Sequence, residues 1–225
     1  MNEPLLMILK IKKQKQMETK NATYYHLILD KSGSMNSHYN ETLEGLNEKL
    51  LSIQNIQKRN PEIPIFVSLT LFSDSPELVF ENKPASELKA LTKEDYVLDG
   101  MTGLLDAVGT VINRMEYLLN RQIRENNANA MIVIFTDGME NASRMYTYEQ
   151  VGNKIKSLEE TGKWSFAFIG ADMDAWSSAS RLNFERSKVF SSRKSNVKDT
   201  MSMMACELEQ SIQLKKEGKI WKGFK

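Results

Sequence analysis

The stretch from residue 24 to residue 35 restricts the fold more than any other part of the sequence. It reads YYHLILDKSGSM, so a short apolar run leads directly into small oxygen-bearing side chains. The run at 24–29 is too short for an independent helix and is apolar at almost every position, which is typical of a strand buried on both faces. We therefore expect Asp30, Ser32 and Ser34 to follow the carboxyl end of a central strand, where ligands bind in open parallel sheets.

Further strands and helices alternate along the rest of the chain. We predict strands at 65–72, 78–80, 130–136, 164–169 and 189–190. Amphipathic helices are predicted at 43–56, 104–124, 149–160, 174–182 and 201–212, with a short helix within 85–98. This alternation predicts an α/β fold with a mostly parallel central sheet. The strand at 78–80 would pair with its predecessor as a hairpin and form one short antiparallel edge.

Oxygen-bearing side chains also occur in two later loops of the predicted sheet. Thr102 precedes the helix at 104–124, and Asp137 follows the strand at 130–136. The complete candidate metal-binding set is Asp30, Ser32, Ser34, Thr102 and Asp137. Mg²⁺ prefers oxygen ligands and usually keeps waters or accepts a partner's carboxylate. With only two carboxylates nearby, such an ion could still attract an acidic group from outside. The alternative is that these residues only cap helices, and Thr102 is expected at the cap of its helix.

The motifs around these side chains resemble a known family. DKSGSM at 30–35, MTG at 101–103 and TDG at 136–138 are similar to the metal-ion-dependent adhesion site of the von Willebrand factor A domain. The resemblance implies a Rossmann-like, three-layer α/β/α fold with helices on both faces of the sheet. It also implies that Ser32, Ser34 and Thr102 are direct or near-direct ligands, with Asp30 and Asp137 often acting through water. The sixth position is left for a Glu or Asp of a partner. The chain departs from the family pattern at Leu104, where many relatives have proline. This difference affects the stiffness of the loop more than the chemistry of the ligands.

This resemblance also suggests how the chain is organised and what it does. We expect a basic amino-terminal leader at 1–20, a von Willebrand factor A domain at 21–215 and a basic tail at 216–225. The expected function is non-enzymatic: a Mg²⁺-dependent module, with Mn²⁺ or Ca²⁺ as substitutes, that captures an acidic side chain of a protein partner. The chain resembles stand-alone bacterial, intracellular members that work beside ATPases, chelatases or stress-response proteins, including tellurium-resistance systems.

Two other functions are considered. A Mg²⁺-dependent, phosphatase-like hydrolase would use Asp30 as its nucleophile, but Ser32 stands where such enzymes generally have a second Asp, and the chain has no P-loop motif. A nucleic-acid binder would use the two basic ends. With 30 Lys and Arg against 29 Asp and Glu, the net charge of +1 provides no strong field for that purpose. The basic leader is therefore interpreted as a solvated arm or short helix.

Composition also bears on the cellular compartment. The single cysteine, Cys206, excludes an intrachain disulfide and favours a reducing compartment. No segment approaches the roughly 20 apolar residues needed to cross a bilayer, and no signal peptide is evident. We expect a cytoplasmic protein that does not engage membranes. His26 is expected in the core, His38 on the surface, and Cys206 as a small packing residue.

Overall fold

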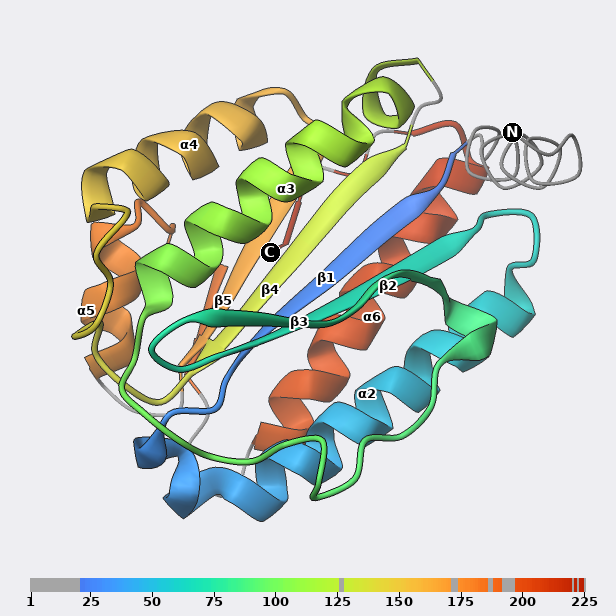
Figure 1. Ribbon diagram of the computed structural model, residues 1–225. Helices are drawn as coiled ribbons and strands as arrows, with labels where there is room; N and C mark the ends of the chain where they lie inside the picture. The colour runs from blue at the N-terminus through green and yellow to red at the C-terminus, as the bar shows by residue number, and fades with distance from the viewer. Residues whose placement is uncertain are drawn as a thin grey trace, which may run out of the picture.

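A six-stranded sheet forms the middle of the molecule, and helices cover both of its faces (Figure 1). The computed structural model describes residues 21–125, 128–170, 174–185, 188–191, 197–219, 221 and 223–224. The strand order is β3-β2-β1-β4-β5-β6, and all neighbouring strands are parallel except β2 and β3. The predicted α/β fold with one antiparallel edge is therefore confirmed.

The elements follow one another along the chain as the alternating pattern predicts. The strands are β1 (Thr23–Asp30), β2 (Ile65–Phe72), β3 (Pro76–Pro84), β4 (Asn129–Thr136), β5 (Trp164–Gly170) and β6 (Val189–Ser191). The α-helices are α2 (Tyr39–Arg59), α3 (Leu104–Glu125), α4 (Tyr148–Glu160), α5 (Asp174–Arg181) and α6 (Val197–Lys216). Two 3-10 helices are η1 (Gly33–His38) and η2 (Ala85–Glu87). No described helix combines the length and apolar character needed to cross a membrane.

The core is divided by the sheet into two apolar layers. Successive side chains of a strand point to opposite faces, so Tyr25, Leu27 and Leu29 of β1 belong to one layer, and Tyr24 and Ile28 belong to the other. The first layer includes the buried faces of α2 and α6, and the second includes those of α3 and α4. Figure 1 shows the same division, with α2 and α6 on one side of the sheet and α3, α4 and α5 on the other.

The strand order places the predicted ligands together. The chain moves outward from β1 to β2 and β3, then returns through α3 to β4 on the other side of β1. This reversal creates a switch point between β1 and β4, where loops diverge from the carboxyl ends of the two strands. Leu29 pairs with Phe135 across this boundary, so the next residues, Asp30 and Thr136, are also neighbours.

Several expectations from the sequence are corrected. His38 was expected on the surface, but it is buried, because the tight turns of η1 bring it to the same inward side as buried Met35, three residues earlier. Cys206 was expected to pack in the core, but it is exposed on α6. The helix expected within 85–98 is a single 3-10 turn, η2. The leader at 1–20 and the side chain of Asp174, expected to cap α5, lie outside the described parts of the molecule.

Candidate metal centre

The five predicted ligands come from four segments that meet at the carboxyl ends of β1 and β4. Asp30 ends β1, Ser32 and Ser34 stand at the start of η1, Thr102 precedes α3, and Asp137 follows β4. Four of the five residues are buried, whereas Ser34 is exposed. The cluster is therefore covered from the protein side and open to solvent at Ser34.

Hydrogen bonds join the cluster from one oxygen to the next. The Thr102 hydroxyl donates to Ser32 Oγ at 3.2 Å, Ser32 Oγ and Ser34 Oγ lie 3.0 Å apart, and the Ser34 hydroxyl donates to Asp137 Oδ1 at 2.7 Å. In an octahedral Mg²⁺ site with bonds of about 2.1 Å, adjacent ligand oxygens are about 3.0 Å apart. The spacing of these four oxygens fits the edges of such an octahedron.

Asp30 accepts a hydrogen bond at each of its two carboxylate oxygens. Its Oδ1 accepts a hydrogen bond from the Ser32 backbone N–H at 2.7 Å, and its Oδ2 accepts one from the Thr136 hydroxyl at 2.5 Å. Burial raises the pKa of the Asp30 carboxyl to about 6, the hydrogen bonds from Thr136 and Ser32 partly oppose this shift, and the nearby Asp137 charge adds to it. The carboxylate therefore fixes the backbone at Ser32 and joins the end of β1 to the end of β4 through Thr136.

Hydroxyl oxygens are essential to the donor set. In the described part of the chain, no group of three or more His, Cys, Asp or Glu side chains is suited to hold a metal ion. Neutral hydroxyls supply oxygen without adding negative charge, so the cluster fits a hard cation that retains affinity for another anion.

Two glycines let the loops approach closely enough to form the cluster. A Cβ atom at Gly138 would lie 3.3 Å from Thr102 Oγ1 and 3.4 Å from Ser34 Oγ. A Cβ atom at Gly103 would lie 2.9 Å from the Ser73 carbonyl oxygen, which accepts a hydrogen bond from the Gly103 N–H at 2.7 Å. Larger residues at these positions would push Thr102 away from the two serines.

Two acidic side chains outside the predicted ligand set fix the loop after β4 to the start of α3. Glu140, which the sequence analysis did not place among the ligands, accepts hydrogen bonds from Leu105 N–H, Ala142 N–H, Ser143 N–H and the Ser143 hydroxyl. Asp106 is buried and accepts from the backbone N–H groups of Arg144, Met145 and Tyr146.

These bonds also correct the predicted helix cap. The N–H groups of Leu105 and Asp106 in the first turn of α3 donate to Glu140 and Ser143, whereas the Thr102 hydroxyl donates to Ser32. For Asp106 the available signal was its place in the first turn of the predicted helix, where an acidic residue is favoured by the positive end of the helix dipole.

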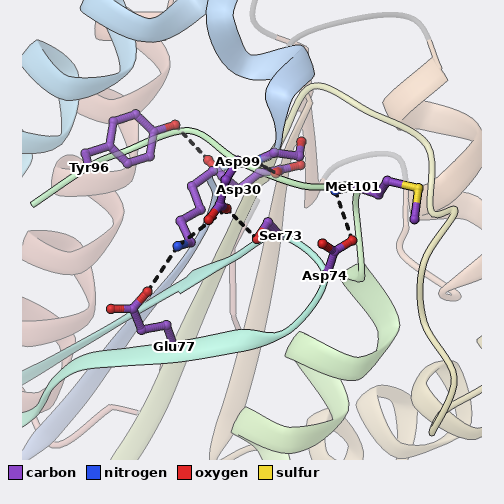
Figure 2. A network of polar contacts seen from close by, with 9 residues as sticks. Asp30, Ser73, Asp74, Glu77, Tyr96, Asp99 and Met101 are labelled. Carbon is purple, nitrogen blue, oxygen red and sulfur yellow. Dashed lines mark hydrogen bonds and ion pairs between the residues drawn. The ribbon is translucent and has the colours of Figure 1, made fainter.

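A second group of polar contacts supports the centre from the β2–β3 side (Figure 2). The Tyr96 hydroxyl donates to the Asp30 carbonyl oxygen at 2.7 Å, and the Ser73 hydroxyl donates to Asp99. Lys31 forms ion pairs with Glu77 and Asp99, so its charge is directed away from the candidate ligands Asp30 and Asp137. These contacts join residues far apart in the sequence, and no local pattern predicts them.

Comparison with known proteins gives matches only at the level of structure. No family model and no curated protein sequence matches the chain. The vWF domain of the type V pili tip protein Mfa5 from Porphyromonas gingivalis is similar, with a TM-score of 0.63 and 9% identity over 87% of this chain and 97% of that one. The ArnB paralog VWA2 from Sulfolobus acidocaldarius has a TM-score of 0.53 and 17% identity over 82% of this chain and 45% of that one.

A third similar structure holds a metal. Proximal thread matrix protein 1 from the mussel byssus, solved with zinc occupying its MIDAS motif, has a TM-score of 0.51 and 13% identity over 87% of this chain and 47% of that one. This chain therefore spans less than half the length of both VWA2 and the byssus protein. At these identities the comparisons establish the fold, which is that of von Willebrand factor A domains.

Proposed function

We propose that this chain, which has a von Willebrand factor A fold, binds a divalent cation and uses it to capture an acidic side chain of a protein partner. Ser32, Ser34 and Thr102 would hold the ion directly or nearly so, and Asp30 and Asp137 would act mainly through water. The ion would supply a positive charge with one coordination position open to a carboxylate. Mg²⁺ is the proposed ion, with Mn²⁺ or Ca²⁺ as substitutes.

The observation that carries this proposal is a row of four oxygens, in which the three hydroxyl oxygens proposed as direct ligands are spaced like neighbouring vertices of an octahedron. They are Thr102 Oγ1, Ser32 Oγ, Ser34 Oγ and Asp137 Oδ1, separated in turn by 3.2, 3.0 and 2.7 Å. These four oxygens come from three separate loops, and solvent reaches them at Ser34. A residue set that served only to cap helices would direct its oxygens to backbone N–H groups, but these hydroxyls bond to one another and to Asp137.

The geometry at Asp30 argues against the alternative hydrolase. A nucleophilic carboxylate needs an oxygen free to reach the substrate. Asp30 is fully buried, and both of its oxygens accept hydrogen bonds from Ser32 and Thr136. Such hydrolases generally have a second acidic group where this chain has Ser32, so no general acid or base stands at that position. We therefore infer a binding function without catalysis.

Titration with Mg²⁺, and with Tb³⁺ as a luminescent probe, tests the centre directly. Thr102→Val keeps the shape of the side chain but removes its hydroxyl, so we expect metal affinity to fall at least tenfold while the circular dichroism spectrum is unchanged. Ser157→Ala, on the exposed face of α4, removes a hydroxyl far from the cluster and serves as the matched control. Equal metal affinity in both variants would refute the assignment of the ligands.

A pair of glycine substitutions tests the positioning of Thr102. In Gly103→Ala the new methyl group would meet the Ser73 carbonyl oxygen at 2.9 Å, so we expect weaker metal binding from displacement of Thr102. In Gly33→Ala the nearest atom is the Gly100 carbonyl oxygen at 3.7 Å, which is an ordinary contact, so metal binding should persist. The same titrations measure both variants, and a greater loss in Gly33→Ala would contradict this account of the loop packing.

The identity of the partner is a separate part of the proposal. By analogy with intracellular members of the resembled family, we propose a cytoplasmic ATPase, chelatase or stress-response protein, without a role for membranes or nucleic acid. Affinity capture from native cell extract, with Mg²⁺ or with chelator, tests this step. We expect a protein retained by the wild type in Mg²⁺ and released by chelator. Recovery of the same protein by Thr102→Val would exclude it as a ligand of this centre.

A further inference from the structure

A cavity lies at the end of the sheet opposite the candidate metal centre. It has a volume of about 450 Å³ and is enclosed by the amino ends of β4 and β5 and by the segment that follows α6. In Figure 1 the end of α6 lies beside the start of β1, whereas η1 lies at the other end of β1. Sites for small molecules generally have volumes of about 300 to 1,000 Å³, so this cavity has room for one.

Positive charge predominates in the lining of this cavity. Its charged residues are the lysines Lys163, Lys188, Lys215 and Lys219 and the glutamates Glu159 and Glu160. Lys188 forms an ion pair with Glu159 at 2.9 Å, and Lys219 forms one with Glu217, beside the cavity, at 2.8 Å. Even with Glu217 included, lysines outnumber glutamates, so the cavity would attract an anion.

Lys215 forms no ion pair within the part of the chain that the structure describes. Its Nζ donates to the carbonyl oxygens of Asn21 and Ala22 at 2.8 and 3.0 Å and to Thr23 Oγ1 at 3.1 Å, and all three acceptors are neutral. Burial, reinforced by the charge of Lys163, lowers the pKa of Lys215 from 10.5 to about 7. An anion in the cavity would stabilise the charged form of Lys215 through its field, since the three N–H groups already have acceptors.

Asn129 provides a hydrogen-bond donor for such an anion. Thr23 Oγ1, which accepts from Lys215, donates to Asn129 Oδ1 at 3.0 Å, and this bond fixes the orientation of the amide. Asn129 lines the cavity and is only 8% exposed. Its Nδ2 has no partner among the described residues and is not fully enclosed by them, so a ligand can reach it. The bonds from Lys215 through Thr23 polarise the amide and strengthen it as a donor.

Two tryptophans supply apolar surface in the same cavity. Trp164 is buried, whereas Trp221 is half-buried and packs edge-on against Phe224, with ring centroids 5.3 Å apart. A Cβ atom at Gly162 or Gly218, which also line the cavity, would meet no atom within 4 Å. The lining is therefore open at these glycines, and a flat ring can enter and pack against an indole.

We propose that this cavity binds a small molecule in which an anionic group is joined to a planar aromatic ring. The anionic group accepts a hydrogen bond from Asn129 Nδ2 near the charge of Lys215, and the ring packs against Trp221. Nucleoside monophosphates and aromatic carboxylic acids share this chemistry. None of the five candidate metal ligands lines the cavity, so the inference is independent of the proposed function.

Isothermal titration calorimetry of the full chain tests this inference, with chelator present so that the candidate metal centre does not contribute. The probes are AMP, with adenosine and inorganic phosphate as its separate parts, and indole-3-acetate, with indole and acetate as its parts. We expect AMP or indole-3-acetate to bind at least tenfold more tightly than either of its parts. The probe that binds identifies a phosphate or a carboxylate as the anionic group. Absence of binding by both probes, or equal binding by a part, would overturn the proposal.

A substitution at Asn129 locates the bound anion. Asn129→Asp keeps the Oδ1 acceptor for Thr23 but replaces the Nδ2 donor with a charged oxygen, so we expect the bound probe to lose affinity at least tenfold. Asn40→Asp makes the same change at an exposed position at the start of α2, next to η1, and should bind as the wild type does. Equal affinity in the two variants would rule out the cavity as the binding site.

Trp221→Leu tests the ring contact separately. The leucine keeps an apolar side chain but removes the flat indole, so we expect the affinity for the bound probe to fall at least tenfold. Circular dichroism and urea unfolding show whether each variant is folded, and the comparison of probes with their parts in the wild type depends on no variant. Unchanged affinity in folded Trp221→Leu would contradict the assigned place of the ring.

Discussion

At the scale of single residues, the centre depends on hydroxyl groups as much as on carboxylates. Ser32 shows why, because its Oγ links Thr102 to Ser34 while its backbone N–H orients Asp30. An aspartate at this position would add negative charge beside Asp30, whose pKa is already raised by burial. On the proposed function, the serine would leave the cluster able to accept a cation and an outside carboxylate together.

His26 is a second residue whose surroundings determine a measurable property, the pKa of its side chain. It was expected in the core, and it is buried, with Nε2 2.8 Å from Thr70 Oγ1. Burial, reinforced by the charge of Arg114, lowers the pKa of His26 from 6.5 to about 3. The folded protein thus holds a neutral imidazole that becomes charged readily only when the chain unfolds.

We predict that His26 makes the protein less stable in acid. Because the folded pKa lies below the unfolded value, this contribution to stability is complete above pH 6.5 and is lost as the pH falls toward 3. The loss is about 1.4 kcal/mol per pH unit, so it reaches roughly 2 to 3 kcal/mol at pH 4.5. Urea unfolding of wild type and His26→Gln at pH 7 and pH 4.5 measures it.

Comparison with the His26→Gln variant separates the effect of His26 on stability from that of other titrating groups. Carboxylates titrate in both proteins, so only the difference between their pH dependences belongs to His26. We expect the variant to lose less stability than the wild type between the two pH values. Identical losses would mean that His26 is protonated equally in the folded and unfolded states.

At the scale of elements, the start of α3 is the platform on which the centre is assembled. Gly103 and the first turn of the helix contact the β2–β3 turn on one side and the loop after β4 on the other. Asp106 is the main point of attachment, because its carboxylate receives three consecutive backbone N–H groups from that loop. The loop carries Asp137 at its beginning, so its position affects the metal ligands.

We predict that Asp106→Asn loosens this loop and weakens the centre. The amide would turn one N–H group toward the backbone donors and would leave buried donors unpaired, at a cost of about 1 to 3 kcal/mol. Amide hydrogen exchange should become faster at residues 139–146, and metal affinity should fall. Glu149→Gln, at an exposed position in the first turn of α4, is the control. Unchanged exchange in Asp106→Asn would show that these hydrogen bonds do not hold the loop.

The sequence predicted elements well wherever their residues follow a regular period. The predicted strand at 65–72 coincides with β2, and the predicted helix at 104–124 differs from α3 by one residue at its end. Irregular segments were predicted less well. η1 turns His38 inward, which its position four residues beyond Ser34 does not reveal. The Thr102 cap was wrong because Glu140 and Ser143, more than 30 residues away, satisfy the first turn of α3.

The residues of the candidate site could be predicted from the sequence to a similar extent. The five proposed ligands stand in short motifs after strands or before a helix, and their proximity follows from the strand order. The supporting residues Thr136 and Tyr96 both donate hydrogen bonds to Asp30. Thr136 belongs to the TDG motif at 136–138, whereas nothing in the sequence around Tyr96 indicates a role. Their contacts depend on which strands and loops become neighbours. Tertiary packing decides this, and a single sequence does not reveal it.

At the scale of the whole molecule, metal binding should stabilise the fold. A ligand that binds only the native state adds about 2.7 kcal/mol when its concentration is 100 times the dissociation constant. For a chain of 225 residues this corresponds to a rise in the melting temperature of roughly 5 to 10 °C. Calorimetry in Mg²⁺ and in chelator measures the change. The rise should be absent in Thr102→Val, and an equal rise in that variant would point to ion binding elsewhere.

The neighbouring positions of β1 and β4 also have a consequence for the order of events during synthesis. The bond between Thr136 and Asp30 spans 106 residues, and the bond between Ser34 and Asp137 spans 103. While the ribosome is still making the segment between Ser34 and Asp137, the nascent chain has three candidate ligands, and four once Thr102 is added, but no Asp137. On the proposed function, the chain would acquire affinity for the ion only after β4 has emerged and inserted beside β1. On the proposed function, a truncated product that ends before β4 would bind neither the ion nor the partner.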